Sequence, residues 1–143
     1  DYAHTDDGLK NVLSSLRPFV KGRFIVLFGC AGERDSAKRI LMAHAVADYA
    51  DYVFLTSDNP RGENPQSIID SVSGYFDEKK VPYTAEVDRR KAINSALNML
   101  QYNDTLILCG KGHEDYQVLN GITVYLDEHD IVKKFMDNYN KEN

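Results

Sequence analysis

The run FIVLFGCAGERD, residues 24–35, decides the fold of this chain. It joins five apolar residues that favour a β-strand to a polar loop containing glycine, and a helical spacing of apolar side chains follows over residues 36–49. YVFLT (residues 52–56) and TLIL (residues 105–108) are further short apolar runs that lead into polar loops. Apolar strands that alternate with helices are typical of a parallel sheet covered on both faces. The sequence therefore predicts an open, doubly wound, mostly parallel α/β sheet.

Residues that favour turns and helix caps mark the remaining elements. Four residues stand at expected helix starts, and they are Thr5, Asn64 (followed by Pro65), Asp88 and Asp127. The first helix is expected to end near Leu16 and the last near Tyr139, and residues 83–87 form a weaker strand. Residues 117–119 and 123–125 flank Asn120-Gly121, the strongest short hairpin signal. We expect this hairpin to add an antiparallel edge to the sheet.

The composition limits the classes of function. The chain has 143 residues, the usual size of one domain, and a formal net charge of -5, which argues against a nucleic-acid partner. No apolar run reaches membrane-spanning length, so no membrane association is expected. Cys30 and Cys109 end apolar runs, and buried reduced thiols in a cytoplasmic protein are the expectation. The chain opens on a polar string without an initiating methionine, which we interpret as an excised domain.

Three polar loops follow the predicted strands, and they span residues 29–35, 57–65 and 109–115. In a Rossmann-like sheet the carboxyl ends of parallel strands meet at one edge, where ligands bind. Neither a phosphate-binding G-x-x-x-x-G-K-[ST] motif nor a G-x-G-x-x-G motif is present in them. The loops therefore predict a ligand site without predicting nucleotide chemistry of the usual kinds.

The cationic members of these loops suit a carboxylate. Arg34 and Arg61 each offer a planar guanidinium, and Asn59 is held extended because Pro60 follows it. A surface ion pair with a neighbouring acid is the alternative for Arg34, and a turn with a capping aspartate is the alternative for DNPR.

The acidic members suit an amine. Asp58 either orients Arg61 or accepts from an ammonium group, and Glu114 is a candidate amine acceptor. Gly110 allows close approach of a ligand to the backbone. Together the loops favour a small zwitterion, with its carboxylate toward the arginines and its ammonium toward Glu114.

The opening segment DYAHT, residues 1–5, carries two more polar candidates. Asp1 suits the paired hydroxyls of a ribose, and His4 suits a phosphate or a base. The alternative is that this segment is only a leader before a helix capped by Thr5.

In the order DYAHT, GCAGERD with Lys38-Arg39, DNPR (residues 58–61) and GKGHEDYQ (residues 110–117), these motifs resemble the C-terminal domain of the Mur ligases over essentially the whole chain. The resemblance implies a longer polypeptide with a UDP-binding N-terminal domain and a central ATPase domain, both outside this chain. It implies that ATP and Mg²⁺ serve the full-length enzyme and that this domain alone holds neither. The implied reaction adds the third residue of the peptidoglycan stem to UDP-MurNAc-L-Ala-D-Glu through an acyl phosphate.

The resemblance also implies a role for each candidate residue. Asp1 and His4 correspond to positions near the nucleotide. Three residues correspond to positions that grip the distal carboxylate of meso-diaminopimelate, and they are Arg34, Asn59 and Arg61. Asp58 supports that motif, and Gly110 and Glu114 correspond to positions that hold the distal amino group. No catalytic residue or metal ligand is expected on this chain.

Two other functions stay open. Lysine-adding members usually lack the arginine of DNPR, so Arg61 favours a diacid such as meso-diaminopimelate or lanthionine over lysine. A non-catalytic nucleotide-binding α/β module also fits the fold, because fold does not fix function. We expect the 143-residue chain to be inactive by itself.

Overall fold

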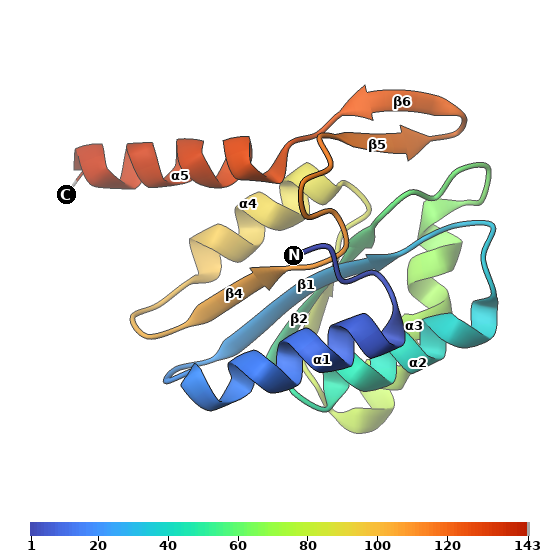
Figure 1. Cartoon of the computed structure of the whole chain (residues 1–143), viewed down its shortest axis with the longest axis horizontal. Coiled ribbons are helices and arrows are strands. Elements are labelled where there is room, and N and C mark those ends of the chain that lie inside the picture. The colour runs from blue at the N-terminus through green and yellow to red at the C-terminus, as the bar shows by residue number, and fades with distance from the viewer. Residues whose placement is uncertain (143) are drawn as a thin grey trace.

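The computed structural model describes residues 1–142 of the chain (Figure 1). The helices are α1 (Asp6–Leu16), α2 (Ser36–Ala47), α3 (Pro65–Lys79), α4 (Arg89–Met99) and α5 (Glu128–Glu142), with a short 3₁₀ turn at Arg17–Phe19. The strands are β1 (Phe24–Cys30), β2 (Tyr52–Ser57), β3 (Tyr83–Ala85), β4 (Thr105–Leu108), β5 (Tyr116–Leu119) and β6 (Ile122–Tyr125).

The first four strands form one parallel sheet in the order β3-β2-β1-β4. The chain winds from β1 outward to β3 and then crosses back to place β4 on the other side of β1. The strand order therefore reverses between β1 and β4, and ligands bind at such a switch point in open α/β sheets. The predicted doubly wound class is confirmed.

Alternate residues of β1 supply two separate cores. Phe24, Val26 and Phe28 face a core shared with α1, α2 and α3. Ile25 and Leu27 face a second core shared with α4 and α5. Figure 1 shows α1–α3 on one side of the sheet and α4 and α5 on the other. Both faces of β1 are buried from solvent, which explains its unbroken apolar sequence.

The hairpin forms at Asn120-Gly121 as predicted, but its position was predicted wrongly. β5 and β6 make a separate two-stranded antiparallel sheet and do not extend the main sheet (Figure 1). Gly110 (φ +108°) and Gly112 (φ +54°) turn the chain away after β4. Asp1 then occupies the backbone groups at the end of β4, since its nitrogen donates to the Leu108 carbonyl (2.8 Å) and its carbonyl accepts from Gly110 (3.0 Å).

The predicted helix caps are confirmed. The side chains of Thr5, Asn64, Asp88 and Asp127 each accept from backbone N–H groups in the first turn of the helix that follows. The weaker strand is shorter than predicted, because it ends at Ala85. Within residues 1–142, no helix is long and apolar enough to span a bilayer.

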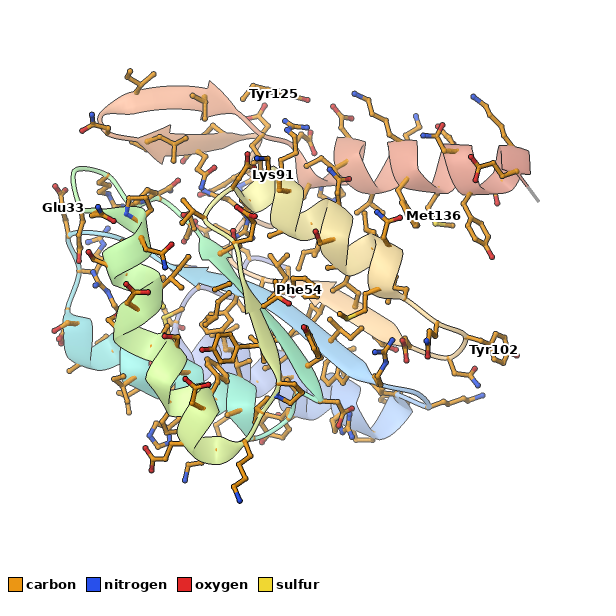
Figure 2. All side chains as sticks on the ribbon, turned by 180° about the vertical axis from the view of Figure 1, so that it is seen from behind. Glu33, Phe54, Lys91, Tyr102, Tyr125 and Met136 are labelled. Atoms are coloured by element: carbon orange, nitrogen blue, oxygen red, sulfur yellow. The ribbon has the colours of Figure 1, made fainter. Side chains whose placement is uncertain are left out.

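Cys30 and Cys109 are free and buried, as expected. Burial raises the pKa of each thiol to about 12, so both stay protonated and unreactive at neutral pH. The two ends of the sheet differ in character. Figure 2 shows Glu33 at the end that carries the polar loops, Phe54 in the interior and Tyr102 at the opposite end.

Candidate functional site

The opening segment and the GKGHE loop lie against each other at the switch point. Besides the backbone bonds that join Asp1 to Leu108 and Gly110, the Oδ1 atom of Asp1 accepts from the Ala3 N–H (2.7 Å). A Cβ atom placed on Gly112 would lie 2.9 Å from the Cβ of Tyr2. Only glycine permits that approach, so the motif glycines fix the path of the DYAHT segment beside the loop.

The DNPR and GKGHE loops meet at the side chain of Lys111. Its Nζ atom donates to Asn59 Oδ1 (2.7 Å), and it also lies 3.0 Å from Asp58 Oδ1 and 3.4 Å from Glu114 Oε2. The side chain is fully buried, with 0% of its surface exposed. The structure thus gathers three predicted site residues around one cation to which no role was predicted.

Of the two roles predicted for Asp58, orienting Arg61 is wrong. Asp58 is buried, and its Oδ1 atom forms an ion pair with the ammonium group of Lys111. Its backbone carbonyl is held from behind by Gln117 Nε2, a buried side chain on β5. Asp58 is therefore anchored from both ends and does not reach the guanidinium of Arg61.

Arg61 stands in the left-handed region (φ +54°) and pairs with the hairpin through its backbone. Its N–H donates to Val118 O (3.4 Å), and its carbonyl accepts from the Asn120 N–H (2.8 Å). The side chain turns to the glycine loop, where Nη1 donates to Gly32 O (2.7 Å). Within residues 1–142 the remaining nitrogens of the guanidinium have no hydrogen-bond partner, so their N–H groups are available to a ligand.

The glycine loop and the DNPR loop touch backbone to backbone. The Gly32 N–H donates to Asn59 O (2.9 Å), and a Cβ atom on Gly32 would lie only 1.9 Å from Pro60 O. Because no side chain fits between these loops, the position of Arg34 is tied to that of Asn59 and Arg61.

A second set of contacts between the glycine loop and the loop that follows DNPR was not predicted. Arg39 donates from Nη1 and Nη2 to the two carboxylate oxygens of Glu63 (2.9 and 2.7 Å). Glu63 Oε2 also accepts from the Glu33 N–H (3.0 Å). These hydrogen bonds, that from Arg39 first, lower the pKa of Glu63 to about 2. Arg39 is the second residue of the Lys38-Arg39 pair in the motif, which was the only sequence signal for it.

Arg34 and His4 line a hollow of about 350 Å³ together with Lys38 and Arg39. Arg34 is exposed, and the surface ion pair considered for it does not form within residues 1–142. His4 Nδ1 shares a hydrogen bond with Tyr2 O (2.9 Å), and its ring centroid lies 4.6 Å from that of Tyr2. Arg34 and His4 therefore share one hollow, while Asp58, Asn59 and Glu114 gather at Lys111.

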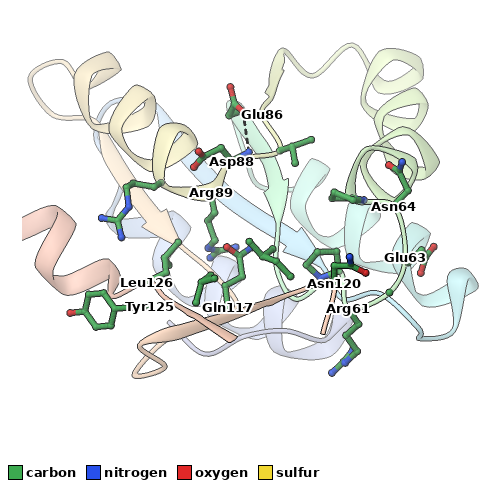
Figure 3. A pocket seen from close by; sticks show the side chains of 17 residues that line it. Arg61, Glu63, Asn64, Glu86, Asp88, Arg89, Gln117, Asn120, Tyr125 and Leu126 are labelled. Atoms are coloured by element: carbon green, nitrogen blue, oxygen red, sulfur yellow. Dashed lines mark hydrogen bonds between the residues drawn. The ribbon is translucent and has the colours of Figure 1, made fainter. Parts of the chain in front are cut away.

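A separate hollow of about 700 Å³ contains few of the predicted site residues. It lies between the start of α3, the start of α4 and the hairpin, and Arg61 is the only predicted site residue along it. Figure 3 shows the guanidinium of Arg61 turned away from this hollow. Much of its wall is apolar, with Pro60, Val87 and Leu119 among its members. The charged set therefore does not belong to this hollow.

A buried arginine supports both loops from below. Arg89, 1% exposed, donates to Ser57 O (3.1 Å) and Cys109 O (2.8 Å), which directly precede DNPR and GKGHE. Its Nε donates to the buried Glu128 at the start of α5 (2.8 Å). This ion pair joins the carboxyl ends of β2 and β4 to α5. Its residues carry no sequence signal, because an arginine after a helix cap is usually a surface residue.

The family model "Mur ligase, glutamate ligase domain" matches residues 1–112 of the chain. The chain belongs to the Mur ligase family. The match includes DYAHT, the glycine loop and DNPR, so the family's domain coincides with the sheet and with most of the loops described above.

Similar Mur ligases extend beyond this chain. It is 44% identical over 141 residues to a UDP-N-acetylmuramoyl-L-alanyl-D-glutamate–2,6-diaminopimelate ligase of Prochlorococcus marinus. The aligned region covers 99% of this chain and 27% of that protein. The corresponding ligase of Caldanaerobacter subterraneus is 45% identical over 136 residues, with 95% and 28% covered. A solved structure of a ligase with this name superposes with a TM-score of 0.91 at 39% identity, over 98% of this chain and 29% of that chain. This Mur ligase chain thus spans little more than a quarter of the length of the relatives it matches.

Proposed function

We propose that this chain is the acceptor-binding domain of an ATP-dependent ligase that adds meso-diaminopimelate, or a similar diacid, to UDP-MurNAc-L-Ala-D-Glu in the cytoplasm. The relatives named above carry that activity in their names and are longer than this chain. The UDP-binding and central ATPase domains would come from the rest of the polypeptide.

One observation carries the proposal: the charged groups of three loops are tied together in a pattern that complements a zwitterion. Asn59 and Arg61 keep free donors for a carboxylate, and Arg34 stands exposed on the glycine loop to which Arg61 bonds. Glu114 is held loosely by Lys111 at 3.4 Å, which leaves it able to accept from an ammonium group. The diamino acid would therefore bind by its distal end, with its carboxylate on the arginine side and its amine beside Glu114 and the Gly110 backbone.

Holding the distal end leaves the other amino group of the acceptor free to attack. The contribution of this domain is then positioning, because fixing two reactants in an attack geometry removes much of the entropy cost of their encounter. No residue of the chain needs to exchange a covalent bond with the substrate.

This chain would supply only part of the nucleotide site, through Asp1, His4 and Lys38. Asp1 Oδ1 is taken by the Ala3 N–H, so Oδ2 is the oxygen that would meet ribose hydroxyls. His4 and Lys38 line the hollow of about 350 Å³, where positive charge suits phosphate. In the full-length enzyme, ATP would supply the phosphoryl group that activates the carboxylate of UDP-MurNAc-L-Ala-D-Glu. Within residues 1–142 no three His, Cys, Asp or Glu side chains gather as a metal site, so Mg²⁺ would take its ligands from phosphates and from other domains.

The test is a comparison of the 143-residue chain with the full-length polypeptide. The full-length enzyme should form the UDP-MurNAc-tripeptide from ATP, the dipeptide substrate and meso-diaminopimelate, and the isolated chain should form none. Ready ATP hydrolysis by the isolated chain would contradict this division of labour. A full-length protein without ligase activity would favour a non-catalytic module instead.

A further inference from the structure

Lys111 is a buried cation whose contacts all lead to the proposed acceptor site. Its ammonium carries three protons, and three oxygens surround it: Asn59 Oδ1 at 2.7 Å, Asp58 Oδ1 at 3.0 Å and Glu114 Oε2 at 3.4 Å. Its Nζ atom also lies 5.6 Å from the ring centroid of Tyr116. An ammonium group with no exposed surface is costly to bury, so its retention between DNPR and GKGHE calls for a reason.

The first consequence concerns the orientation of Asn59. Its Oδ1 accepts from Lys111 Nζ (2.7 Å) and from the Val118 N–H (3.0 Å), which occupies both lone pairs. The amide nitrogen must then point away from both donors. In the described part of the chain this nitrogen has no hydrogen-bond acceptor, so its two protons are available to a carboxylate. Without the ammonium group, one of the two contacts that fix this orientation is lost.

The second consequence concerns charge. Asp58 and Glu114 approach the same Nζ atom, and the ammonium group offsets the repulsion between the two carboxylates. With Lys111 between them, the cluster keeps one net negative charge. Glu114 has the longer of the two contacts, and its Oε1 lies 3.5 Å from the hydroxyl of Tyr116. It is therefore the carboxylate that turns most easily to a substrate ammonium.

We infer that Lys111 is a positioning residue of the acceptor site, which turns the Asn59 amide donors toward the substrate carboxylate and sets Glu114 to receive the substrate amine. Lys111 itself does not touch the substrate, because its side chain is fully buried and its ammonium group already contacts Asn59, Asp58 and Glu114. This inference rests on the proposed function, and it adds a specificity determinant for the distal end of the diamino acid.

The test uses the full-length ligase with Lys111→Met, which removes the charge and keeps much of the side-chain length. The KM for meso-diaminopimelate should rise about tenfold, the equivalent of about 1.4 kcal/mol, while the KM values for ATP and for the UDP-linked dipeptide stay unchanged. Arg23→Met is the matched control, since Arg23 pairs with Asp104 (2.6 Å) just before the amino end of β1. It should lower thermal stability and leave all three KM values unchanged. An unchanged KM for diaminopimelate in Lys111→Met would overturn the inference.

If Lys111→Met alone does not fold, a second pair of variants tests the same inference. Asp58→Asn with Lys111→Met keeps the net charge of the cluster and removes a buried ion pair as a unit, which proteins tolerate better than the loss of one partner. Its KM for diaminopimelate should exceed that of Asp58→Asn alone by several-fold, and equal values would contradict the inference. The wild-type enzyme is assayed first. If it does not use diaminopimelate, the proposed function is wrong, whereas an active wild type with unaffected Lys111 variants refutes only the role of Lys111.

Discussion

Replacement of Gly32 by alanine should separate the two loops that present Arg34 and Arg61. A Cβ atom at this position would lie 1.9 Å from Pro60 O and 2.6 Å from Pro60 C, and real Cβ contacts essentially never fall below 3.0 Å. The loops must therefore move apart by about 1 Å. Both obstructing atoms belong to the backbone, so no side-chain rotation relieves the overlap.

The cost follows from the contacts that this movement breaks. The Gly32 N–H bond to Asn59 O (2.9 Å) and the Arg61 Nη1 bond to Gly32 O (2.7 Å) both span the gap. Each is worth about 1 kcal/mol, and backbone strain adds to them, so the free energy of unfolding should fall by about 2–4 kcal/mol. A shift of this size in the groups that hold a substrate can reduce catalytic efficiency by about 100-fold.

The assay is urea unfolding followed by circular dichroism, together with ligation kinetics in the full-length enzyme. Gly74→Ala is the matched control, because Gly74 lies in α3 and an added Cβ would meet no atom within 4 Å apart from its chain neighbours and the adjacent backbone of its own helix. The control should gain about 0.5–1 kcal/mol in stability and keep wild-type kinetics. If Gly32→Ala is as stable and as active as the wild type, the loops are not coupled through this contact and the reasoning is wrong.

Three further predictions concern single groups. Arg61→Ala in the full-length ligase should raise the KM for meso-diaminopimelate by about tenfold or more, and unchanged kinetics would remove Arg61 from the site. Arg89→Met should lower the free energy of unfolding by about 3–5 kcal/mol because it strands the buried carboxylate of Glu128, and adding Glu128→Leu should restore much of the loss. Hydrogen bonds from arginines lower the pKa values of Glu63 and Asp104 to about 2 in the folded state, below those of the unfolded chain. Both carboxylates therefore add stability above their unfolded pKa values, and urea titrations should show this stability falling as the pH drops from about 5 to 2. Glu63→Gln should flatten that dependence, and an identical slope would count against the Arg39 bond as its source.

Periodicity and capping residues predicted the sheet and the helix starts because these depend on local chemistry. Thr5, Asn64 and Asp88 cap helices through their own side chains, and the apolar run of β1 is buried on both faces. At the end of β4, backbone groups that an added strand could use are bonded to Asp1, which lies more than a hundred residues away in sequence. No local pattern reports such a contact, so the hairpin was wrongly assigned to the sheet edge.

The candidate site likewise combines residues that local motifs predict with residues whose contacts come from distant parts of the chain. The motifs identified Asp58, Asn59 and Glu114, and the order of the strands brings their loops together. The role proposed for Lys111 rests on geometry alone, since a lysine between two glycines is ordinarily an exposed loop residue. Arg89 escaped notice for a similar reason, because its burial depends on carbonyls from two strands and on a carboxylate from α5.

The identity of the acceptor tests the central claim most directly. The measurement is the ratio of kcat/KM for meso-diaminopimelate to that for L-lysine in the full-length ligase, with ATP and UDP-MurNAc-L-Ala-D-Glu saturating. Because lysine lacks the distal carboxylate that Asn59 and Arg61 are proposed to bind, the ratio should favour diaminopimelate by about 100-fold or more. Equal use of the two acceptors, or a preference for lysine, would contradict the assignment of these loops to a diacid.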